Sequence, residues 1–167
     1  MTSLVTRRSL LRAGFLLAAG VGAGSFIWLR DPEEGFRWLS PGEVRIIAAV
    51  AEVLFPPGNP VGPDHTEVAV AREADRLLDT NVDPEKRDAF RYLLRTLEIG
   101  TLVSRGVVFS EASAEMRAAV LEIWGQHDPF PRRIALDSLK PVIGMPYFSD
   151  PGVLAAMGYG DLCKVPS

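Results

Sequence analysis

The chain has 167 residues, of which 47% are hydrophobic and 23% charged, and its formal net charge is −3. All 21 acidic residues lie at or after Asp31, whereas four of the 18 basic residues precede it. The part that starts at Asp31 therefore has 14 basic and 21 acidic residues, a net charge of −7, which argues against nucleic acid or anionic lipid as its partner.

Residues 6–29 have the pattern of an export leader. Adjacent Arg7 and Arg8, followed by Arg12, precede a long apolar run without charge. Their context, T-R-R-S-L-L-R, resembles the twin-arginine signal, which exports proteins that are already folded and often carry a cofactor. We therefore expect a protein that is exported to the periplasm or to the outer face of the cytoplasmic membrane. An ordinary secretory signal, or a membrane anchor with its arginines inside, is the alternative.

The sequence leaves the fate of this leader open. Val21-Gly22-Ala23 offers the small residue that a signal peptidase requires, but the apolar run continues beyond it to Leu29. Uncleaved, Ala13 to Leu29 would be about the shortest helix that spans a membrane. We divide the chain into a signal or anchor segment (1–29), a linker (30–39) and one helical domain (40–167), because roughly 140 residues suffice for one domain of ordinary size.

The first helix of this domain is predicted from local chemistry at both ends. Ser40-Pro41-Gly42-Glu43 combines a capping residue, a proline suited to the first turn and a glutamate three residues after the cap. Apolar residues then recur at helical spacing until Phe55-Pro56-Pro57 ends the helix. A loop rich in proline and glycine follows over residues 58–64. A second helix is predicted over about 66–79, with Asp75 among its outward-facing residues.

A third and longest helix is predicted to begin at Asp83-Pro84 and to end at Gly106. Arg87, Arg91 and Arg95 recur along it at every fourth residue, so they share one face. We expect this face to be solvated, and the alternative is a docking site for an acidic partner.

Three shorter helices complete the domain. One is capped by Ser110 or Ser113 and closed by Gly125, one runs over 131–143 with an interruption or end near Pro141, and one opens at Asp150-Pro151 and stops at Gly158. No segment alternates at period two. The predicted fold is all-α, a single compact domain of five or six helices preceded by the export leader.

The residues predict no catalytic, cofactor-binding or metal site in this chain. His65 and His127 are the only histidines, and both lie in loops or turns, so a metal site that joins them to Asp64 and Asp128 is a minor alternative. No phosphate-binding glycine loop precedes a helix in the domain. Cys163 is the only cysteine, which excludes an internal disulfide and the usual attachment of a c-type haem.

Two stretches carry a family resemblance. The first is L-S-P-G-E (39–43) leading into A-A-V-A-E-V-L-F-P (48–56), and the second is Y-F-S-D-P (147–151) followed by A-A-M-G-Y (155–159). Together they resemble the gluconate 2-dehydrogenase subunit 3 family, the small subunits of membrane-associated, flavin-dependent sugar and polyol dehydrogenases. The loop P-P-G-N-P-V-G-P (56–63) and the short C-terminal end with Cys163 depart from that pattern.

The resemblance implies a non-catalytic subunit that escorts and stabilises another protein. The implied partner is a large FAD-dependent subunit of the glucose-methanol-choline type without its own leader, and a cytochrome c subunit carrying haem usually accepts the electrons. This would explain why a domain without a cofactor has a leader that exports folded proteins, since the twin-arginine translocase would carry both chains together. The alternatives are a stand-alone exported helical scaffold and a small metalloenzyme that uses His65 or His127.

An escort subunit needs a stable interface, and such interfaces are apolar with aromatic side chains near the centre. Aromatic residues in loops or at helix ends are the candidates, with ordinary core packing as the alternative for each. They are Trp38, Trp124, Phe130, Tyr147, Phe148 and Tyr159.

Overall fold

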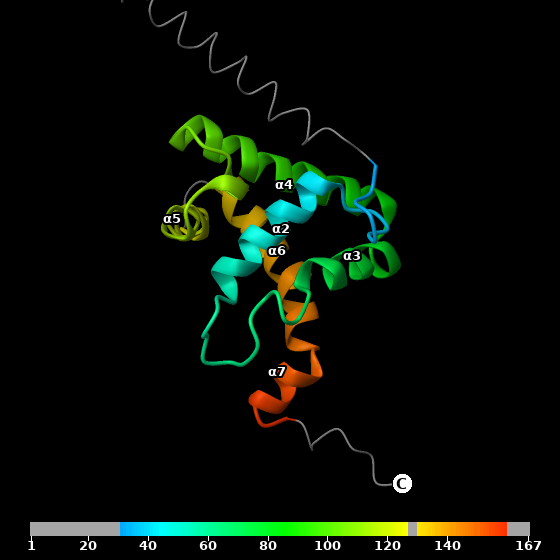
Figure 1. The fold of residues 1–167 in the computed structure, drawn as a ribbon. Coiled ribbons are helices and arrows are strands. Elements are labelled where there is room, and N and C mark those ends of the chain that lie inside the picture. Colours follow the sequence, from blue (N-terminus) through cyan, green and yellow to red (C-terminus); the bar gives the residue numbers. More distant parts are fainter. Residues whose placement is uncertain (1–30, 127–129, 160–167) are drawn as a thin grey trace, which may run out of the picture.

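The computed structural model describes residues 31–126 and 130–159, and this part of the chain is all-helical, as predicted (Figure 1). Its helices are α2 (Pro41–Leu54), α3 (Val70–Asn81), α4 (Pro84–Arg105), the 3-10 helix η1 (Phe109–Glu111), α5 (Ala114–Gly125), α6 (Phe130–Phe148) and α7 (Pro151–Ala156). The predictions for the leader with Arg7 and Arg8, for His127 and Asp128, and for Cys163 lie outside the described residues.

Helix α2 is the centre of the domain and packs against α3, α4, α5 and η1 (Figure 1). Ile46, Ile47 and Val50 are fully buried on it. It begins as the sequence predicts, because the Glu43 carboxylate accepts the backbone N–H of Ser40 at 2.9 Å. Both predicted ends of this helix are confirmed.

The long helix α6 packs against α3, α5 and α7. The prediction that it ends or breaks near Pro141 is wrong, since it continues through Pro141 and Pro146 to Phe148. A proline removes one hydrogen bond from a helix and crowds the preceding turn. Here three core residues at four-residue spacing, Leu139, Ile143 and Tyr147, are fully buried and hold the helical course on both sides of the prolines.

The second predicted helix starts later than expected. Residues 66–69 form turns, and α3 begins only at Val70 after Ala69, whose φ of 53° is left-handed. The Asp64 side chain accepts the N–H of Thr66 at 2.7 Å and that of Glu67 at 3.2 Å. This local bonding competes with a helix, which explains the delayed start.

The remaining helix ends agree with the sequence. Gly106, with φ of 80°, ends α4, and Gly158, with φ of 83°, follows α7 as its left-handed stop. Ser113 caps α5 by accepting the N–H of Met116, and Asp150 caps α7 by accepting two backbone N–H groups.

The proline-rich loop over residues 56–65 packs against α6 and α7. The Tyr147 hydroxyl donates to the Pro63 carbonyl at 2.7 Å, and its ring stacks on Phe55 at a centroid distance of 3.6 Å. Gly62 has φ of 143°, and a Cβ there would lie 2.9 Å from the Cβ of Ala156. The loop can approach α7 this closely only because residue 62 is glycine.

Candidate partner-binding surface and charged core

Two of the three arginines in the stripe of α4 lie neither on a solvated face nor on a docking site. Arg91 and Arg95 are buried, with 9% and 7% of their surface exposed. The Nε atom of Arg91 lies 2.6 Å from a carboxylate oxygen of Glu43, which is fully buried on α2, and Arg95 Nη2 lies 3.9 Å from the same oxygen. Both interpretations of the stripe were therefore wrong for these two residues, because their acidic partner belongs to this chain.

Asp75 was expected to face outward and is buried instead, at 2% exposure. Its carboxylate accepts three consecutive backbone N–H groups, from Arg37 at 2.7 Å, Trp38 at 3.0 Å and Leu39 at 2.8 Å. A buried carboxylate is stable only when such donors satisfy it. Helix α3 thus uses a buried charge to hold the segment that precedes α2.

The six aromatic candidates for the partner interface divide by burial. Trp124 and Tyr147 lie in the hydrophobic core, at 6% and 0% exposure, so the fold itself uses these two side chains. Trp38 is half-buried under the guanidinium of Arg91, 4.2 Å from its ring centroid. Phe148 is 45% exposed and Tyr159 is 50% exposed. Phe130 opens α6, and its side chain lies outside the description. The role of these residues in an interface stays a prediction.

The sequence prediction missed two exposed methionines near Phe148 and Tyr159. Met145, near the end of α6, is 58% exposed and Met157, just after α7, is 43% exposed. Methionine adapts its shape readily, which suits it to binding surfaces. Met145 could have been found only with α6 extended past Pro141, because the helical spacing then sets it apart from the buried face of Ile143 and Tyr147.

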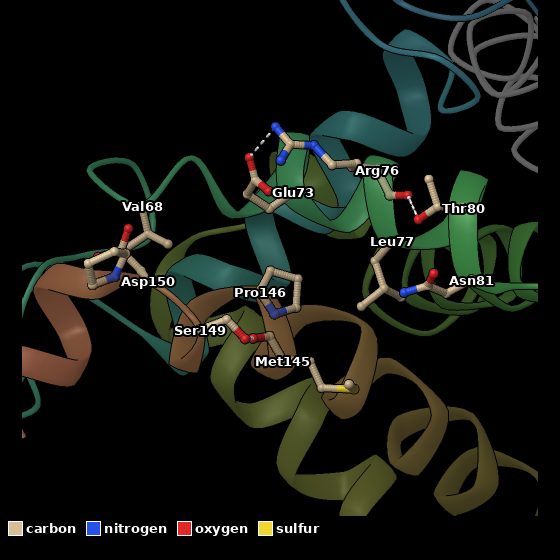
Figure 2. Close-up of a pocket in the computed structure, with 11 residues that line it drawn as sticks. Val68, Glu73, Arg76, Leu77, Thr80, Asn81, Met145, Pro146, Ser149 and Asp150 are labelled. Atoms are coloured by element: carbon tan, nitrogen blue, oxygen red, sulfur yellow. Dashed lines mark hydrogen bonds and ion pairs between the residues drawn. The ribbon is translucent and has the colours of Figure 1, made fainter. Parts of the chain in front are cut away.

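Met145 lines a groove of about 490 Å³ between α3 and the junction of α6 with α7. Figure 2 shows Met145 and Pro146 of α6 on one side and Leu77 and Asn81 of α3 on the other. Its charged side chains and hydroxyls have partners: Arg76 pairs with Glu73 at 3.1 Å, Asp150 caps α7, and the hydroxyls of Thr80 and Ser149 donate to backbone carbonyls. The groove is thus lined by both apolar and polar side chains, and its charged groups and hydroxyls are engaged within this chain.

A second apolar surface lies on α4. Tyr92, Ile99 and Val103 are 61%, 41% and 83% exposed, and their spacing places them on one face of the helix. Helices α4 and α7 lie at opposite ends of the domain in Figure 1. The domain thus exposes apolar side chains on α4, and others on α6 and just after α7.

The shifted pKa values belong to local turns and helix starts. Hydrogen bonds from the Thr66 side chain and from backbone N–H groups lower the pKa of Asp64. The hydrogen bond and the attraction between Asp83 and Lys86 lower the pKa of Asp83 and raise that of Lys86. The pKa of Glu115 is lowered by its own backbone N–H and by Ser113. None of these four groups lines the groove.

Among the described residues, no three His, Cys, Asp or Glu side chains are grouped so that they could hold a metal ion. His65 lies with Nδ1 3.3 Å from the Phe55 carbonyl, a contact between the end of the proline-rich loop and the end of α2. Within residues 31–126 and 130–159, no helix has the length and apolar character that a membrane span needs.

A family comparison decides the identity of this domain. The sequence profile described as gluconate 2-dehydrogenase subunit 3 matches residues 41–153. The chain belongs to the gluconate 2-dehydrogenase subunit 3 family. The match runs from the first residue of α2 into α7, so it covers the helices that build both the charged core and the groove. Neither the curated proteins nor the solved structures contain a match.

Proposed function

We propose that this chain is the non-catalytic small subunit of an exported, FAD-dependent dehydrogenase that oxidises a sugar or an alcohol. The observation that carries the proposal is the family match over residues 41–153, because the family is that of a dehydrogenase subunit and the match includes nearly the whole described domain. The chain escorts the folded catalytic subunit through the twin-arginine translocase and stabilises it afterwards. FAD belongs to the catalytic subunit of the glucose-methanol-choline type, and a cytochrome c subunit takes the electrons.

The chemistry of the domain supports a binding role. The buried charged groups include Glu43, Asp75, Arg91 and Glu98. Each of these four is engaged with another side chain or with the backbone, so they serve the fold. The groove beside α6 offers hydroxyls and charges that already have partners. General acid and base catalysis instead requires titratable groups that converge on a substrate.

We place the contact with the catalytic subunit on the exposed apolar side chains of α6 and of the segment after α7, which are Met145, Phe148, Met157 and Tyr159. Phe148 packs edge-on against Phe55 at 5.6 Å and against Tyr147 at 5.2 Å, so its exposed ring is held in place before a partner arrives. Aromatic anchors of this kind dominate the affinity of many interfaces, and a fixed anchor loses little entropy on binding. The adjoining groove offers room for a side chain of the partner.

Export gives the first test. The chain is co-expressed with its dehydrogenase partner, either unchanged or with Arg7→Lys and Arg8→Lys together, and dehydrogenase activity is measured in periplasm and cytoplasm. Trapping of the activity in the cytoplasm is the expected result, since the paired arginines are the feature that the translocase recognises. Unchanged periplasmic activity would rule out the escort role.

Co-purification tests the surface. Phe148→Ser should reduce recovery of the catalytic subunit at least about tenfold, because loss of a central aromatic anchor costs more than about 1.4 kcal/mol. Tyr92→Ser, an exposed aromatic on the opposite apolar surface, is the matched control. A stronger effect of Tyr92→Ser would place the interface on α4, and a stable monomer with no flavoprotein bound to the unchanged chain would favour a stand-alone scaffold.

A further inference from the structure

The segment that joins the predicted leader to the helical domain is fastened by buried charges. We call residues 33–40 the strap. Within it the N–H of Glu33 donates to the carbonyl of Leu39 at 2.8 Å, and the N–H of Phe36 donates to the carbonyl of Glu33 at 2.9 Å. These bonds close the strap into a loop at the start of α2. Further contacts come from Asp75 and Arg91, which are far away in the sequence.

Helix α3 makes the first fastening. Asp75 Oδ1 accepts the N–H groups of Trp38 and Leu39, and Oδ2 accepts that of Arg37. A carboxylate that accepts three backbone N–H groups in a buried site forms strong, charge-assisted bonds. Since Asp75 is brought to the strap by the packing of α3 on α2, these bonds exist only in the folded domain.

Helix α4 makes the second fastening. Arg91 donates from Nη2 to the carbonyl of Trp38 at 3.0 Å, and its guanidinium lies over the indole ring of the same residue. The Nε atom of Arg91 pairs with Glu43, whose other carboxylate oxygen accepts the N–H of Ser40. One arginine thus connects the strap to α2 and α4 at once.

The strap itself buries few side chains. Leu39 and Ser40 are fully buried, whereas Phe36 and Trp38 are half-buried and Arg37 is exposed. A segment with few buried apolar contacts opens at a lower free energy than the core does. Leu39 belongs to the hydrophobic core, and Phe36 and Trp38 pack against that core. The polar attachment of residues 37–39 comes from Asp75 and Arg91.

We infer that the strap is a folding-dependent fastener that fixes the point at which the preceding chain leaves the domain. The fastening forms only after α3 and α4 have packed on α2, and loss of Asp75 or Arg91 releases the strap without unfolding the helices. A leader that precedes the strap then departs from a defined place on a folded domain and from no defined place on an unfolded one. This inference concerns the fold of the chain alone and holds whichever protein it escorts.

Hydrogen exchange followed by mass spectrometry tests this in the purified full-length chain. Asp75→Asn keeps the shape of the side chain but removes its charge and one acceptor oxygen, and Arg91→Lys keeps the charge but removes the planar group that reaches Trp38. In both variants we expect amide exchange in residues 37–39 to be about tenfold faster or more, with α2 and α6 amides within about twofold of the unchanged chain.

Asp79→Asn is the matched control. Asp79 lies one turn further along α3 and pairs with the side chains of Arg37 and Arg87, each at 3.2 Å. It should leave exchange in residues 37–39 within about twofold of the unchanged chain, since no backbone bond of the strap is lost. Unchanged protection in both Asp75→Asn and Arg91→Lys would overturn the inference. It would also be overturned if both variants fail to fold or accelerate all amides equally, because the strap would then be inseparable from the core.

Discussion

The two segments that flank the central helix α2 are held by different chemistry. The strap, residues 33–40, precedes α2 and is held by the buried carboxylates and guanidinium of Glu43, Asp75 and Arg91. The proline-rich loop, residues 56–65, follows α2 and is held by neutral groups: the stacked rings of Phe55 and Tyr147, a tyrosine hydroxyl and the Asn59 amide.

This difference bears on how each segment tolerates change. A buried ion pair stabilises a fold only while both partners are present, because the partner that remains after a mutation is a buried, uncompensated charge. A neutral hydrogen bond or a ring contact contributes about 1 kcal/mol, and its loss leaves no charge behind. A single substitution among the charged groups should therefore detach the strap. The loss of one neutral contact should weaken the attachment of the loop only in part.

The largest effect is expected from Glu43→Gln. This change should lower the free energy of unfolding by about 3–5 kcal/mol, because Arg91 keeps its charge in a buried site after its partner at 2.6 Å is neutralised. Urea denaturation followed by circular dichroism measures it.

Glu34→Gln is the matched control, since Glu34 is an exposed glutamate within the strap. It should change the free energy of unfolding by less than about 0.5 kcal/mol. Equal effects of the two substitutions would show that charge does not hold this end of the domain, and the contrast between the two segments would disappear.

Much of the fold follows from local sequence chemistry. The start of α2 at Ser40, the end of α4 at Gly106 and the start of α7 after Asp150 all depend on residues within one turn of the helix end. Such signals need no knowledge of the rest of the chain. The family resemblance was also predictable from short motifs, and the match over residues 41–153 confirms it.

The charged core could not be predicted in the same way. Charged residues are mostly exposed, so a stripe of Arg87, Arg91 and Arg95 indicates a solvated face unless a buried partner is known. That partner, Glu43, lies on another helix. The periodicity within one helix does not predict which residues of two helices meet. The buried position of Asp75 is likewise a result of how α3 packs beside the strap.

The aromatic residues show a related limit for the candidate site. Trp124 and Tyr147 entered the core, whereas Phe148, next to Tyr147 on the same helix, has 45% of its surface exposed. Adjacent helical residues differ in direction by about 100°. Which of the two side chains is buried can therefore be predicted only if α6 is known to continue past Pro141. Local sequence rules predicted that the helix ends there, so the exposure of Met145 was not predicted.

A moderate effect is expected from Tyr147→Phe, which removes a neutral contact of the proline-rich loop. The hydroxyl donates to the Pro63 carbonyl at 2.7 Å and lies 3.2 Å from Asn59 Oδ1, so its removal should lower the free energy of unfolding by about 0.5–1.5 kcal/mol. The Pro63 carbonyl keeps the Asn59 amide as a donor at 3.3 Å, which limits the loss.

Urea denaturation and amide exchange of Val61 would measure this change, because the Val61 N–H is held by the side chain of Asn59. Tyr159→Phe provides the control, since Tyr159 is half exposed. A loss as large as that of Glu43→Gln would mean that the neutral segment is as brittle as the charged one.

The smallest effect is expected at Asp64, which begins the turn between the proline-rich loop and α3. Its pKa lies below the ordinary value of 3.8, first because the Thr66 hydroxyl donates to it and then because backbone N–H groups do. A folded-state pKa that is lowered makes the ionised carboxylate stabilising above the unfolded pKa, and this stabilisation is lost as the pH falls through the folded value. Thermal melts of the unchanged chain and of Asp64→Asn should therefore differ at about pH 7, and the difference should shrink by about pH 3 and below. A difference in melting temperature that stays constant over this range would mean that the turn depends on the shape of the Asp64 side chain and not on its charge. A stabilising role of charge would then be expected for the strap and not for this turn.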